Sequence, residues 1–150
     1  MSTDESYVRR AIELSKGAVE NGNTPFGSLL VIDDDVVRTA ENTTLTEDDI
    51  AAHPEFKLAR WAARELEAAE REACTMYTST EPCPMCASAI AYAGLERVVY
   101  SVPVESLADV RDDGVIEIPC EEVFDRADVR TGVDGPILED EGLAVHDAYF

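Results

Sequence analysis

The sequence has few cations, and lysines are especially scarce. Its 150 residues include 32 Asp and Glu against 12 Lys and Arg, which gives a formal net charge of -20. Lys16 and Lys57 are the lysines, and the other cations are arginines. Such a surface repels nucleic acids and anionic membranes unless a local basic patch intervenes, so we expect neither as a partner. The scarcity of lysine also predicts adaptation to high salt, with an ordinary acidic protein as the alternative.

Long apolar runs are missing as well. No segment approaches the roughly 20 apolar residues that span a bilayer. The first five residues are acidic and lack the basic start and apolar core of a signal peptide. We therefore expect a cytoplasmic protein, in which cysteines stay reduced and clustered cysteines indicate a metal site. Of the four cysteines, only Cys83 and Cys86 have a spacing that suggests chemistry.

The chain length and the hydrophobic patterns predict one α/β domain over residues 1–150. Strand, helix and strand follow one another at short intervals, which favours right-handed parallel crossovers. A proline at position 54 suits the first turn of a helix, and Gly94 suits a helix end. The predicted helices cover residues 3–21, about four turns from 54, 84–94 and a closing segment near 138–149, and the predicted strands cover 26–32, 36–41, 75–79, 97–101 and 115–118.

Two predicted helix starts carry residues that bind metals. His53 and Glu55 open one helix, and Cys83 and Cys86 open the next. Unsatisfied N–H groups at helix starts favour deprotonated thiols, and one imidazole with two thiolates supplies three of the four tetrahedral positions of zinc. A catalytic site leaves the fourth position to water. A structural site would need a distant fourth ligand, for which the candidates are Cys74, Cys120 and His146.

The combination of H-x-E at 53–55 and P-C-x-x-C at 82–86 resembles the zinc-dependent cytidine and deoxycytidylate deaminase superfamily. The resemblance covers about residues 4–101, and its nearest branch holds guanine, nucleoside and tRNA adenosine deaminases. It implies a three-layer α/β/α sandwich with a five-stranded mixed, mostly parallel sheet. It also implies one Zn²⁺ per chain on His53, Cys83 and Cys86, with Glu55 as the proton shuttle. Pro54 replaces the alanine that relatives usually have, and we expect little harm at a helix first turn.

The resemblance also implies a reaction and substrate contacts. A zinc-bound hydroxide would attack the amidine-like carbon of a base, and ammonia would leave. Asn42 lies where relatives hydrogen-bond the substrate, although asparagine is also common in loops. Phe26 is a candidate for the pocket wall, with a core position as the alternative. Asp113, or its neighbour Asp112, stands at about the distance of an acidic residue that reads the purine in guanine deaminases.

The acidic composition narrows the substrate class. Residues 131–150 contain no Lys or Arg, whereas an enzyme that acts on tRNA needs cations for the phosphates. We therefore favour a free nucleobase or nucleoside, with a guanine-like purine first. The alternatives are cytosine or cytidine, tRNA adenosine, and a non-enzymatic zinc module that binds a partner through its acidic face. The resemblance also implies a homodimer, in which Tyr149 and Phe150 would either cover the partner's site or pack the closing helix.

Overall fold

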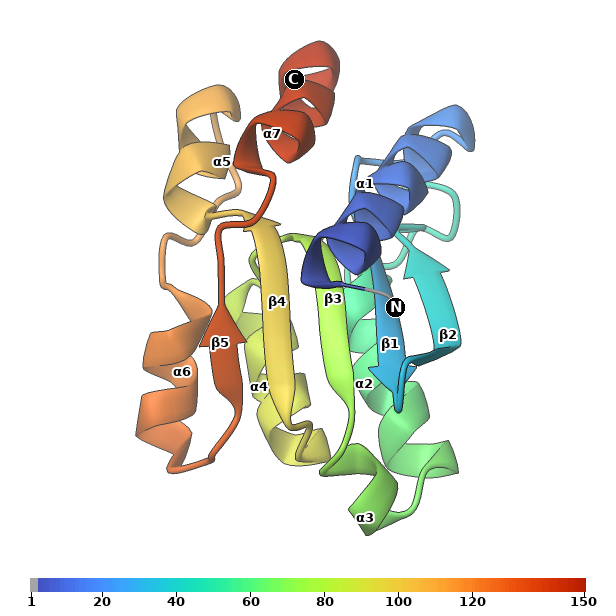
Figure 1. The fold of residues 1–150 in the computed structure, drawn as a ribbon. Helices are drawn as coiled ribbons and strands as arrows, with labels where there is room; N and C mark the ends of the chain where they lie inside the picture. Colours follow the sequence, from blue (N-terminus) through green and yellow to red (C-terminus); the bar gives the residue numbers. More distant parts are fainter. Residues whose placement is uncertain (1–2) are drawn as a thin grey trace.

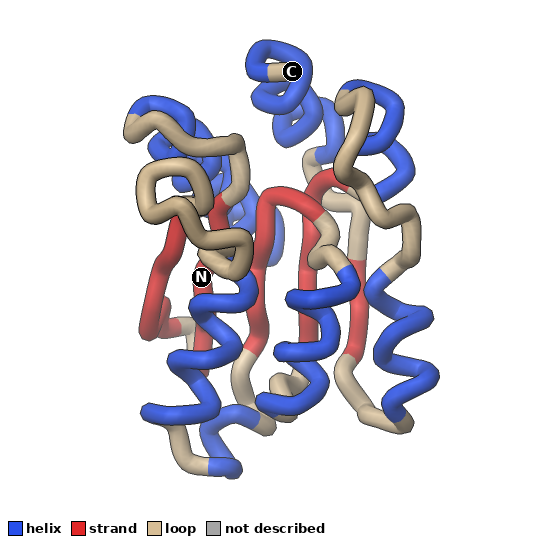
Figure 2. Tube along the Cα trace, turned by 180° about the vertical axis from the view of Figure 1, so that it is seen from behind, coloured by secondary structure: helices blue, strands red, loops and turns tan. Residues whose placement is uncertain are grey.

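The computed structural model describes residues 3–150, and its centre is a five-stranded sheet between two layers of helices (Figures 1 and 2). The sheet order is β2-β1-β3-β4-β5. Because β1 is antiparallel to β2 and β3, while β3, β4 and β5 pair in parallel, four strands share one direction. The predicted α/β/α sandwich with a mixed, mostly parallel sheet is thus confirmed. The strands are β1 Gly27–Ile32, β2 Asp35–Glu41, β3 Thr75–Thr80, β4 Arg97–Val102 and β5 Gly132–Asp134.

The helices divide between the two faces of the sheet. In Figure 1, α1 (Asp4–Glu20) and α7 (Glu139–Tyr149) lie in front of the sheet. Figure 2 shows the opposite face, which α2 (Pro54–Glu65), α4 (Pro84–Ala93) and α6 (Cys120–Ala127) cover. Two shorter helices, α3 (Ala68–Arg71) and α5 (Val104–Val110), lie in connections. Within residues 3–150, none of the helices has the length and apolar character that a membrane crossing requires.

Alternating side chains of the central strands fill two separate cores. Leu30 of β1 and Met76 of β3 belong to the core beneath α2, α4 and α6. Leu29 and Tyr77, their neighbours along the chain, belong to the core beneath α1. Successive side chains of a strand point to opposite faces, so a strand covered by helices on both sides must be apolar at every position. The apolar run at 29–32 of β1 has this origin.

Local signals set most helix ends where the sequence predicts them. The side chain of Thr3 accepts a hydrogen bond from the Ser6 N–H, and the Ser6 side chain accepts one from the Thr3 N–H, which forms a capping box before α1. Gly94 ends α4 with φ 74°, a left-handed conformation that favours glycine. The predicted boundaries of these two helices are therefore confirmed.

Two predicted elements are wrong. Residues 115–118 form no strand but lie in the loop before α6, and the position beside β4 is taken by β5 at Gly132–Asp134. The second helix is also shorter than four turns. It ends at Leu66, whose backbone is extended, and the next residue, Glu67, caps the short α3. Ala69, which continues the apolar pattern, is exposed because this segment has left the face of the sheet.

Candidate active site

Two prolines place the predicted metal ligands just outside two neighbouring helices. His53 caps α2 and precedes Pro54, and Cys83 caps α4 and precedes Pro84. Steric contact with a following proline keeps a residue out of the helical region, and both ligands are accordingly extended. Cys86 lies inside the first turn of α4 and is buried. Because α2 and α4 pack against each other, all three side chains converge.

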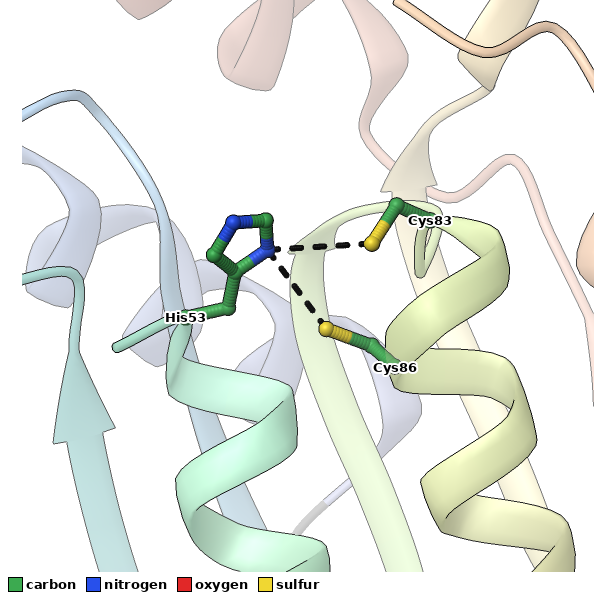
Figure 3. A group of neighbouring side chains, drawn as sticks. All are labelled: His53, Cys83 and Cys86. Carbon is green, nitrogen blue, oxygen red and sulfur yellow. Dashed lines mark hydrogen bonds between the residues drawn. The ribbon is translucent and has the colours of Figure 1, made fainter. Parts of the chain in front are cut away.

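The three side chains have the spacing of a tetrahedral zinc site (Figure 3). His53 Nδ1 lies 3.7 Å from the Cys83 sulfur and 3.5 Å from the Cys86 sulfur. Ordinary Zn–N and Zn–S bond lengths at a tetrahedral angle require an N···S separation of about 3.6 Å. Among residues 3–150, no fourth side chain joins this group. The donor set therefore fits zinc with one position left for a small molecule.

The charge state of the cysteines suits metal binding. A hydrogen bond from Cys86 lowers the pKa of Cys83 to about 4, with a further contribution from His53. The same bond and the burial of Cys86 raise the pKa of Cys86, so the pair shares one proton. The contact with Cys83 raises the pKa of His53. The lowered pKa of Cys83 favours its thiolate, the form that binds a metal.

Glu55 has the environment of a general acid and base. It lies one residue inside α2 and is 4% exposed. Burial raises its pKa to about 7, which keeps both the acid and the carboxylate available near neutral pH. Its Oε1 lies 3.4 Å from the hydroxyl of Ser28, which lies 2.8 Å from Thr78 Oγ1.

A cavity of about 190 Å³ opens on His53, Glu55 and Cys83. Asn42 and Phe26 line it, as the sequence predicts. Asn42 Oδ1 accepts hydrogen bonds from the backbone and the hydroxyl of Thr44, at 3.0 and 2.8 Å, which leaves its Nδ2 as a donor. Pockets that hold drug-sized ligands have volumes of roughly 300–1,000 Å³. This cavity is smaller and therefore suits a smaller molecule.

The structure does not bring the two candidate aspartates to this cavity. Asp112 and Asp113 are exposed, whereas their neighbours Arg111 and Gly114 are lining residues. The role given to Asp113 by the resemblance therefore stays a prediction without support from its position. Arg111 is a charged lining residue that sequence reasoning missed, since one arginine in a loop carries no local signal.

The C-terminal residues contact the site of their own chain. The Phe150 ring stacks on His146 at 5.9 Å, and the guanidinium of Arg111 lies 5.1 Å from the Phe150 centroid. His146 lies outside the group of possible metal ligands, and its Nε2 lies 2.7 Å from Thr80 Oγ1. Cys74 and Cys120 are buried outside the ligand group. The structural-zinc alternative thus lacks its fourth ligand among residues 3–150.

Glu81 links the loop that carries Cys83 to the starts of α5 and α6. It is 7% exposed and precedes Pro82 and Cys83 in the chain. One carboxylate oxygen accepts the backbone N–H of Val104, and the other accepts that of Cys120, both at 2.9 Å. These residues begin α5 and α6. The carboxylate thus holds two helix starts, a role that its place in the motif does not reveal.

An α/β/α sandwich that presents one histidine and two cysteines from adjacent helix starts, beside a buried glutamate, defines a zinc hydrolase. Residues 1–102 match the family described as cytidine and deoxycytidylate deaminase zinc-binding region, and the chain belongs to this family. Its homologues are deaminases, which are hydrolases of C–N bonds.

Relatives named for different substrates resemble this chain. A probable cytosine deaminase of Schizosaccharomyces pombe is 30% identical over 98% of this chain and 92% of its own. The guanine deaminase of Bacillus subtilis is 35% identical over 73% of this chain and 70% of its own. The tRNA-specific adenosine deaminase of the same organism is 38% identical over 67% of this chain and 62% of its own.

Solved structures share the fold. The structure of the guanine deaminase of Nitrosomonas europaea has a TM-score of 0.80 at 20% sequence identity. The match covers 99% of this chain and 85% of the Nitrosomonas chain. A Bacillus subtilis guanine deaminase structure has a TM-score of 0.68 at 34% identity, over 75% of this chain and 72% of that one.

Proposed function

We propose that this protein hydrolytically deaminates a free nucleobase or nucleoside, with a guanine-like purine as the preferred substrate. The observation that carries the proposal is a cavity of about 190 Å³ lined by His53, Glu55 and Cys83, at which the group of His53, Cys83 and Cys86 can hold a metal. When bound, zinc supplies a Lewis acid that lowers the pKa of a coordinated water from 15.7 to about 7. A base-sized molecule in this cavity would then contact both the metal and a proton carrier.

The residues of the chain have distinct roles in this reaction. Glu55 takes one proton from the attacking water and gives it to the ring nitrogen, and then carries the second proton of that water to the departing amine. Asn42 donates its free amide hydrogens to the base. The ring of Phe26 packs against the base and excludes water from the cavity.

The charge of the cavity wall supports a small substrate. Among the described residues that line the cavity, Arg111 is the one lysine or arginine. A tRNA loop brings several phosphates, which need several cations, so tRNA adenosine is disfavoured. The 35% identity to a guanine deaminase supports guanine. Cytosine is the second candidate, because the probable cytosine deaminase matches over nearly the whole of both chains.

Ammonia release from a panel of compounds tests the proposal. Zinc-loaded protein in high salt is given guanine, guanosine, adenine, cytosine, cytidine and tRNA, and we expect release from guanine first. Glu55→Ala should retain zinc but lose about 10²- to 10⁴-fold in rate. Glu65→Ala, at the exposed end of the same helix, is the matched control.

Three outcomes of this panel contradict parts of the proposal. Release from cytosine alone transfers the assignment to cytosine. A Glu55→Ala variant as active as the control removes Glu55 from the chemistry. No release from any compound favours the non-enzymatic zinc module.

The homodimer and the cytoplasmic, salt-rich location are also proposals. Large apolar side chains that face solvent, such as Tyr92 at 92% exposure and Ile50 at 87%, support burial against a second copy. Sedimentation of the zinc-loaded protein tests the dimer, and a monomer at micromolar concentration contradicts it.

A further inference from the structure

Arg111 is a cation without an acidic partner in a very acidic protein. The ion pairs among residues 3–150 involve Arg9, Lys16, Arg97 and Arg126, and none involves Arg111. Yet Arg111 is half-buried and lines the cavity that contains Glu55. Other cations among residues 3–150 also lack ion pairs, but Arg111 is the one lysine or arginine among the described lining residues, so its N–H groups can bind a ligand that accepts hydrogen bonds.

Neighbouring groups hold the guanidinium in place. It lies 5.1 Å from the Phe150 centroid, a cation–π distance. It also crosses Gly114, where an added Cβ would come 3.3 Å from Nη2. Phe150 stacks on His146, and the His146 and Phe26 ring centroids are 5.2 Å apart. A row of rings thus runs from Phe26, in the cavity wall, to Arg111, and fixes the guanidinium before a ligand binds.

The local charge selects a neutral ligand. One Zn²⁺ with the thiolates of Cys83 and Cys86 would carry no net charge. Among the other lining residues, Glu55 and Glu81 contribute at most one negative charge each, and Arg111 contributes one positive charge. A phosphate monoester would add up to two negative charges against a single arginine in an acidic chain. A neutral base with hydrogen-bond acceptors adds no charge and still satisfies the guanidinium.

We propose that Arg111 determines specificity by binding the carbonyl oxygen and the adjacent imidazole nitrogen of an oxopurine. This inference rests on the proposed function. The planar fork of an arginine matches the O6 and N7 acceptors of guanine. Deamination at C2 places that carbon at the metal, so the O6 and N7 edge faces away from it. Adenine offers one acceptor and one donor on the same edge and pairs less well.

Binding of two unreactive bases to the zinc-loaded protein tests this inference by calorimetry. Hypoxanthine has the O6 and N7 acceptors, purine lacks the oxygen, and neither has an amine to lose. We expect the wild type to bind hypoxanthine about 10- to 100-fold more tightly than purine, as a hydrogen bond to a charged group predicts. Arg111→Met should bring this ratio close to one, and Arg111→Lys should give an intermediate ratio. Arg126→Met, on an 81% exposed side chain of α6, is the matched control.

Two results overturn the inference. The first is an unchanged hypoxanthine-to-purine ratio in folded Arg111→Met or Arg111→Lys protein. The second is inorganic phosphate that displaces hypoxanthine from the wild type and from the Arg126→Met control alike, or that binds only when Arg111 is present. Failure of the proposed function looks different: guanine then releases no ammonia, although the ratio and its dependence on Arg111 persist.

Discussion

The buried carboxylate of Glu81 holds the starts of two helices in place. Its two oxygens accept the first N–H groups of α5 and α6, each at 2.9 Å. Glu81→Gln preserves the shape of the side chain but replaces one oxygen by an NH₂ group, which cannot accept a hydrogen bond. One helix start then faces a donor instead of an acceptor, in a place that is 7% exposed.

The expected loss of stability follows from these contacts. A hydrogen bond to a charged group contributes about 1.5–3 kcal/mol. Removing the negative charge from two helix starts costs about 0.3–1 kcal/mol at each. We therefore expect the free energy of unfolding to fall by about 2–5 kcal/mol. For a chain of this length, that change lowers Tm by roughly 4–20 °C.

Thermal unfolding of zinc-loaded protein, followed by circular dichroism, measures this loss. Glu121→Gln is the matched control, since Glu121 follows Cys120 in the first turn of α6 but is exposed. The control should shift Tm by no more than about 2 °C, because surface substitutions change stability by about 0.5 kcal/mol. If the two variants unfold within 2 °C of each other, roughly the uncertainty of this estimate, the two-helix role of Glu81 is refuted.

Acidity and salt give two further predictions. Burial lowers the pKa of His146 to about 4, so the unfolded chain binds a proton first as the pH falls below about 6.5. In urea unfolding, the free energy of unfolding of the wild type should fall by up to about 3 kcal/mol between pH 6.5 and 4, and His146→Leu should lack this fall. Equal pH dependence in both proteins contradicts the prediction. The net charge of -20 predicts a higher Tm in molar KCl than in low salt, and equal Tm values would argue against salt adaptation.

The sequence predicts the metal ligands well because their placement is local. A proline after His53 and another after Cys83 fix both residues at helix starts, and the spacing to Cys86 keeps it in the first turn. The prediction of a strand at 115–118 fails for the opposite reason. A strand needs a free sheet edge, and the edge of β4 is occupied by residues 132–134, a choice that no local pattern records.

The sequence by itself therefore determined the α/β class and which residues could hold a metal, His53, Cys83 and Cys86, since the motifs that carry these predictions are local. Only the tertiary structure decided what surrounds them. Arg111 reaches the cavity, and Phe150 lies against it, because segments far apart in the chain pack together. Glu81 shows both sides: its place beside Cys83 is local, but its two partners lie 23 and 39 residues away. Hydrogen bonds between distant segments depend on packing, which short-range patterns do not encode.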